Sequence, residues 1–143
     1  MLIGSALVAL LAAPPASAPT LDGVAVSVAQ NCQFWALPGG GNLVCVKLKH
    51  APELPEGRLH WESHPDKADP LTAEVSQLEE LSGSKASAAK ACKFNGRPAT
   101  CRTLEVGKMV YRFAQSSRGG KVVLARCEGG KELPAFCATH FEP

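Results

Sequence analysis

The chain has 143 residues, of which 15 are Lys or Arg and 13 are Asp or Glu, so its formal net charge is +2. This length suits a single domain, and a content of 45% hydrophobic and 20% charged residues excludes a disordered chain. No run of 18 apolar residues occurs, so the sequence predicts no membrane-spanning helix.

The first eighteen residues have the layout of a secretory signal peptide. An apolar run over residues 2–13 is followed by two prolines and then by Ala16-Ser17-Ala18, the small-x-small pattern of a signal-peptidase site. We therefore expect residues 1–18 to be removed and residues 19–143 to form one domain. That domain would be exported to the periplasm or the extracellular space.

Six cysteines fit such an oxidising compartment, where an even set usually forms disulfides. Segments 37–42 and 95–98 are rich in Gly, Pro and Asn and predict chain reversals, the second of which sets Cys92 opposite Cys101. No C-x-x-C spacing points to a metal site instead. The positions predict three local disulfides: Cys32–Cys45, Cys92–Cys101 and Cys127–Cys137.

In the first half of the domain, side chains alternate between apolar and polar in the manner of β-strands over three segments: 23–30, 43–49 and 58–63. A helix is predicted next, over residues 70–82. Asp69 is its expected N-cap, Pro70 would occupy the first helical position, and Gly83 would end the helix.

The second half predicts a hairpin over 92–106 and another with strands at 108–115 and 121–127, followed by a terminal helix over 132–141. Residues 84–91 fit either a helix or a linker. A five-residue loop at 116–120 would place one set of apolar side chains on a common face, and we expect these to form a buried cluster with the last helix: Tyr111, Phe113, Val123, Leu133 and Phe136. The predicted fold class is α+β, with an antiparallel sheet of about five to seven strands and two main helices.

A resemblance to a known family rests on the order of these elements and on three short segments: Phe94-Asn95-Gly96-Arg97-Pro98-Ala99, Tyr111-Arg112-Phe113 and Gly119-Gly120-Lys121-Val122-Val123-Leu124. A cysteine and a terminal helix with a second cysteine follow them. The chain resembles the PsbP-like group of small exported α/β/α domains. That resemblance implies a non-enzymatic accessory or binding domain and carries over no catalytic residue.

Motifs for catalysis or metal binding are weak. His60 and His64 flank Glu62, but on a strand they would lie about 13 Å apart, too far to share one ion. Two matches to S-x-x-K, at 82–85 and 87–90, lack the partner motifs of penicillin-binding enzymes. The sequence therefore predicts no catalytic residue, no metal ligand and no cofactor.

Charge is segregated along the chain. Residues 53–80 contain eight acidic and two basic residues, whereas residues 85–126 contain ten basic and one acidic residue. A basic surface could bind an anionic polysaccharide, lipid headgroups or an acidic protein. The predicted register places Arg112 and Arg126 on one sheet face, and we expect a patch formed by Arg102, Arg112, Lys121 and Arg126. The alternative is that the two halves neutralise each other in the fold.

Two classes of function remain open. The first is an exported, non-catalytic binding or accessory domain for an anionic ligand or an envelope protein, with a membrane surface as a further partner. The second is an inhibitor or immunity-type protein, in which Phe34, Trp35 and the loop 37–42 would form a wedge. A small enzyme is the least favoured class. Nucleic acid is not expected, because the chain would be exported and has no aromatic-basic binding motif.

Overall fold

The computed structural model describes residues 19–21, 23–131 and 135–143. The predicted signal peptide, residues 1–18, lies outside the described residues, as does Leu133 of the predicted core. Within the described residues, no helix is long and apolar enough to cross a membrane.

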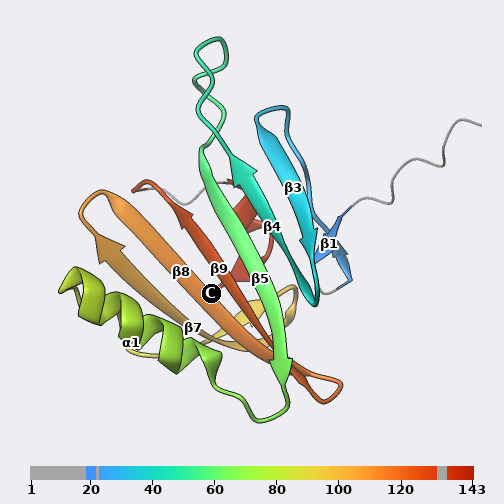
Figure 1. Cartoon of the computed structure of the whole chain (residues 1–143), viewed down its shortest axis with the longest axis vertical. Helices are drawn as coiled ribbons and strands as arrows, with labels where there is room; N and C mark the ends of the chain where they lie inside the picture. The colour runs from blue at the N-terminus through green and yellow to red at the C-terminus, as the bar shows by residue number, and fades with distance from the viewer. Residues whose placement is uncertain (1–18, 22, 132–134) are drawn as a thin grey trace, which may run out of the picture.

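Eight antiparallel strands form the main sheet, in the order β10-β6-β7-β8-β9-β5-β4-β3 (Figure 1). Three consecutive hairpins join β6 to β9, whereas β5 pairs with β9 and β10 pairs with β6 over long sequence distances. The strands are β3 (Cys32–Leu37), β4 (Gly40–Cys45), β5 (Gly57–Pro65), β6 (Lys90–Phe94), β7 (Arg97–Val106), β8 (Met109–Arg118), β9 (Lys121–Gly129) and β10 (Phe141–Glu142).

Helix α1 (Pro70–Ser82) covers one face of this sheet over β7 and β8, and leaves the same face open over β3, β4 and β5 (Figure 1). We call this the helix face. Asp69 caps the helix by accepting hydrogen bonds from the backbone N–H and the hydroxyl of Thr72. These bonds lower the pKa of Asp69, and the bond from the Thr72 hydroxyl has the larger effect. The prediction of a helix over residues 70–82 is confirmed, including its end at Gly83.

The opposite face carries all three disulfides, and we call it the disulfide face. Its core joins residues that are distant in the sequence, because apolar side chains of β4, β5, β8 and β9 meet those of β6, β10 and residues 21–26. A two-stranded sheet of β1 (Thr20–Leu21) and β2 (Val24–Ala25) belongs to this side, as does the single-turn α2 (Ala135–Ala138). A second, smaller core lies under α1: Leu71, Val75, Leu104, Phe113 and Leu124.

The predicted α+β class is wrong, because the fold is mostly β. The main sheet has eight strands rather than five to seven. The helix predicted over 132–141 is, in the described residues, one turn at Ala135–Ala138, after which Phe141 enters β10 opposite Phe94. In a short segment, the same spacing of apolar residues fits either a helix or a single helical turn followed by a strand. Here the residues after the turn form their backbone hydrogen bonds with β6 instead of within a helix.

The register predicted for the β8–β9 hairpin is wrong, because the expected five-residue loop would pair Phe113 with Val123, three residues from its partner in the structure. The turn consists of Gly119 and Gly120 alone, with Arg118 opposite Lys121, so Phe113 faces Arg126. Both turn glycines have positive φ, as tight two-residue hairpin turns require. Because side chains alternate between the faces of a strand, a shift by an odd number of residues moves them to the other face. Phe113 therefore packs under α1, whereas Val123, its predicted partner, lies on the disulfide face.

The three predicted disulfides are confirmed. Cys32 and Cys45 are directly opposite each other, with Cα atoms 4.0 Å apart. Cys92 lies opposite Ala99 rather than Cys101, so its bridge is diagonal, with a Cα separation of 5.9 Å. The two-residue turn at Asn95-Gly96 causes this difference from the predicted pairing.

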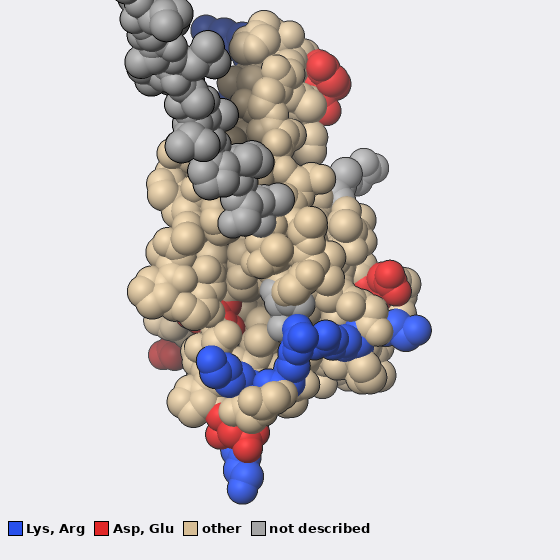
Figure 2. Space-filling model, turned by 90° about the vertical axis from the view of Figure 1, so that its right-hand side faces the viewer, with Lys and Arg blue, Asp and Glu red and all other residues tan. Residues whose placement is uncertain are grey.

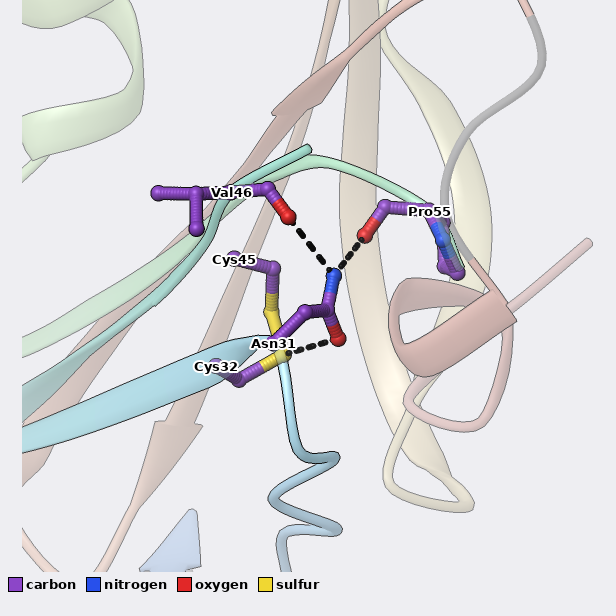
Figure 3. The surroundings of a disulfide bond; sticks show 5 residues. All are labelled: Asn31, Cys32, Cys45, Val46 and Pro55. Carbon is purple, nitrogen blue, oxygen red and sulfur yellow. Dashed lines mark hydrogen bonds between the residues drawn. A yellow bond between two sulfur atoms is a disulfide. The ribbon is translucent and has the colours of Figure 1, made fainter. Parts of the chain in front are cut away.

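Two predicted strands are shorter or displaced. Of residues 23–30 only Val24–Ala25 is a strand, and the strand predicted at 43–49 is Gly40–Cys45. β4 begins at Gly40 because the turn before it is only Pro38-Gly39, and Asn31, which is 5% exposed, holds the chain just after β4 ends (Figure 3). Its Nδ2 donates to the carbonyls of Val46, at 3.0 Å, and Pro55, at 2.8 Å, so it fastens both ends of the long β4–β5 loop beside the first disulfide.

Buried His140 connects the C-terminal segment to the β6–β7 turn. Its Nδ1 lies 2.6 Å from Oδ1 of Asn95, and the Nδ2 of Asn95 donates to the carbonyl of Leu21 at 2.8 Å. Burial lowers the pKa of His140 below its ordinary value of 6.5. One imidazole thus joins three distant parts of the chain in its neutral form.

We expect the free energy of unfolding to fall as the pH drops below about 6.5. Below about pH 6.5 His140 is protonated in the unfolded chain but still neutral in the folded protein, so proton binding favours unfolding. This loss of stability stops once the pH falls below the lowered pKa of His140 in the folded protein. Urea unfolding at pH 7.5 and 5.5 measures the effect. His140→Asn should reduce this pH dependence, and an unchanged dependence in that variant would contradict the assignment to His140. Exposed His50→Asn is the control.

Candidate functional site

The four arginines and lysines of the predicted patch do not form one surface. Arg126 lies on the helix face, where its Nη1 forms an ion pair with Glu74 of α1 and its Nε lies 3.7 Å from Glu128. The acidic segment thus packs over Arg126 and neutralises it, which was the alternative considered for the sequence. Lys121 is exposed beside the Gly119-Gly120 turn.

Arg112 lies on the other face of the sheet from Arg126, because it is opposite Cys127. The predicted common face is therefore wrong, for the register reason given above. Arg112 instead shares a hollow with Arg102 of the predicted patch and with Lys90, which the sequence analysis counted only as one charge in a basic run. Two of the four predicted basic residues are brought together, and Lys90 joins them.

This hollow has a volume of about 440 Å³ and lies at the start of β6, where the preceding residues bond to β7. Ser87 N donates to the carbonyl of Thr103 at 2.8 Å, and Thr103 N donates to the hydroxyl of Ser87 at 2.9 Å. We call it the cationic hollow, and its polar lining residues are Ser87, Lys90, Arg102, Thr103 and Arg112.

A different surface lies at the β3 edge of the sheet. Phe34 and Trp35 lie within strand β3 rather than on a loop, so the wedge predicted for them is not a loop. Phe34 points to the disulfide face and stacks on Trp61 with ring centroids 5.8 Å apart. Trp35 points to the helix face beyond the reach of α1 and is 43% exposed. The predicted loop 37–42 is a two-residue turn, Pro38-Gly39, between paired strands.

Exposed apolar side chains are concentrated near this edge. In the described part of the chain seven large hydrophobic side chains are exposed, and five of them come from residues 24–46. Figure 2 views this side and shows a broad area without charged residues above a band of lysines and arginines. We call the surface formed by these five exposed side chains near the β3 edge the β3 surface: Val24, Val28, Trp35, Leu37 and Val46.

His64 of β5 lines a second hollow, of about 670 Å³, between that strand and α1. Nε2 of His64 is 3.0 Å from Glu62 and Nε2 of His60 is 3.7 Å from the same carboxylate, so one carboxylate lies between both imidazoles. Among the described residues, no group of three or more His, Cys, Asp or Glu side chains is placed to hold a metal ion.

No protein-family model matches this chain, and comparison with curated proteins finds no match. Inference about function therefore rests on the geometry of the β3 surface and of the two hollows. The three disulfides, meanwhile, indicate an oxidising environment.

Proposed function

We propose that this chain is an exported, non-catalytic binding domain that docks on a protein partner through the β3 surface. The observation that carries the proposal is that five of the seven exposed large apolar side chains of the described residues, Trp35 among them, come from residues 24–46, and that Figure 2 shows a broad area without charged residues on the side of the β3 edge. Contiguous exposed apolar patches mark interaction sites, and the centres of protein interfaces are depleted of charge and enriched in aromatic residues.

The strand that presents Trp35 is held rigidly. The disulfide Cys32–Cys45 closes one end of the β3–β4 hairpin, and the carbonyl of Gly39 accepts a bond from Ser63 N, at 2.8 Å, at the other end. A partner would therefore meet a preorganised aromatic side chain and lose little conformational entropy in that contact. An accessory protein and an inhibitor would both use such a surface, and the position of Leu37 beside the turn suits insertion into a partner's groove.

Export is part of the proposal and is supported by the sequence of residues 1–18 and by the three disulfides. The resemblance to the PsbP-like group, which implies an accessory domain, stays a prediction.

Site-specific photo-cross-linking in the secreting cells tests the docking surface. A photoreactive phenylalanine analogue at Trp35 should give a discrete protein adduct, whereas the same analogue at Met109, an exposed apolar position on β8, should not. Trp35→Ala should weaken binding to the cross-linked partner by about 30-fold, as expected for an aromatic at the centre of an interface. Equal adducts at both positions, or none at Trp35, would contradict the proposal.

A further inference from the structure

The cationic hollow lies away from the β3 surface, because β9, β5 and β4 separate β8 from β3 in the main sheet. Among the described residues, the charged side chains that line it are Lys90, Arg102 and Arg112, with no Asp or Glu side chain, and Pro143, the last residue, also lines it. Lys90 and Arg112 line the hollow from the disulfide face, whereas Arg102, which is opposite Phe113, lines it from the helix face of β7, next to the disulfide Cys92–Cys101.

The two guanidinium groups are held in place by other contacts. Nε of Arg102 donates to the carbonyl of Ser87 at 2.9 Å, a bond that leaves both terminal nitrogens of the group for other acceptors. The guanidinium carbon of Arg112 lies 5.5 Å from the ring centroid of Phe141, so a cation–π contact supports it from one side. Both residues are only partly exposed, whereas Lys90 is exposed at the rim.

Within the described residues, none of these three cations forms an ion pair with a carboxylate. Arg58 and Arg126 differ from them, because each has an acidic partner. The acidic residue nearest in sequence on the same strand, Glu105, is exposed and pairs across the strands with Val110. In the part of the chain that the structure describes, no Asp or Glu side chain thus pairs with the positive charges of the hollow.

We propose that the cationic hollow binds a phosphate or sulfate group. Guanidinium groups present parallel N–H donors that match the oxygens of such anions, and a lysine adds a mobile third charge. The hydroxyls of Ser87 and Thr103 line the same volume and can donate further bonds. A doubly charged oxyanion suits three cations better than a single carboxylate does, because more of the repulsion among them is relieved.

Titration of the folded protein with inorganic phosphate and with sulfate tests the site. Backbone amide shifts in NMR spectra should change at residues 87–90, 101–103 and 112 and remain constant around Trp35. Arg102→Gln and Arg112→Gln should each weaken binding about tenfold, the usual effect of losing a charged hydrogen bond. Lys121→Gln is the matched control, because it removes one exposed charge outside the hollow and should leave the affinity unchanged.

Two further arms separate the sources of the anionic group. Heparin presents sulfate on a polysaccharide, and phosphatidylglycerol vesicles present phosphate on a membrane. Tighter binding to either one than to the free anion, with the same loss in Arg112→Gln, would identify the carrier and support the site. Arg112→Lys keeps the charge and should retain part of the affinity. Absence of binding to all four probes, or an equal loss in Lys121→Gln, would overturn the proposal without bearing on the β3 surface.

Discussion

Replacing Phe113 with alanine is expected to lower the free energy of unfolding by about 3–5 kcal/mol, the usual loss for a fully buried aromatic side chain. Phe113 is 0% exposed and packs against Leu71 and Val75 of α1, with Leu104 and Leu124 beside it on the sheet. Its removal leaves a cavity in the apolar cluster that joins α1 to the sheet, and α1 should loosen. Because small domains have a total stability of about 5–15 kcal/mol, urea unfolding will show the change clearly.

Met109→Ala is the matched control, since Met109 starts the same strand and is 40% exposed. Its effect should stay within about 0.5 kcal/mol, as is usual for surface substitutions. If Phe113→Ala unfolds at the same urea concentration as the wild type, the packing of α1 on β8 is not the source of stability that the structure indicates.

The burial of Phe113 could be predicted from the sequence, but its neighbours could not. Alternation along 108–115 and 121–127 shows which side chains share a face within each strand. The relation between the strands depends on the turn, where one residue more or less exchanges the faces. Ser116 belongs to the strand and is 4% exposed, although a serine next to another serine and two glycines is typical of a loop.

Features determined by near neighbours were predicted well. Helix α1 has its cap, its first-turn proline and its terminal glycine within fifteen residues, and the disulfides close loops of 9 to 13 residues. The pairings of β5 with β9 and of β10 with β6 join segments that are distant in sequence. Nothing in a local pattern specifies such pairs, so the strand count and the terminal strand were missed.

Only part of the cationic hollow could be predicted from the sequence, again because it depends on pairing between distant segments. A basic run indicated a positive surface, but the face of each arginine depended on the register, and the partner of Arg126 came from a helix 52 residues earlier. The sequence around Lys90 shows only its positive charge and the S-x-x-K match at 87–90, neither of which indicates that it lines a hollow. Asn31 gave none, because a single asparagine beside a cysteine has no distinctive spacing.

Removal of the last disulfide, by the double substitution Cys127→Ala and Cys137→Ala, should lower the free energy of unfolding by about 2–3 kcal/mol in the chain-entropy description. Both cysteines are 0% exposed, and the bridge closes a loop of 10 residues. It fastens the segment that contributes His140 and Phe141 to the core of the disulfide face. Hydrogen exchange should show the amides of β10 and the end of β6 exchanging faster than those of β4 and β5.

The same double variant should also weaken phosphate binding in the cationic hollow. Phe141 supports the guanidinium group of Arg112, and Pro143 lines the hollow, so loosening this segment disturbs the site without removing any of its charges. Removing Cys32 and Cys45 instead is the matched control, because that bridge closes a loop of 13 residues at the far edge of the sheet. Both variants should lose similar stability, but only the first should lose affinity for phosphate. Equal affinities in folded samples of the two variants would show that the C-terminal segment does not hold Arg112 in place.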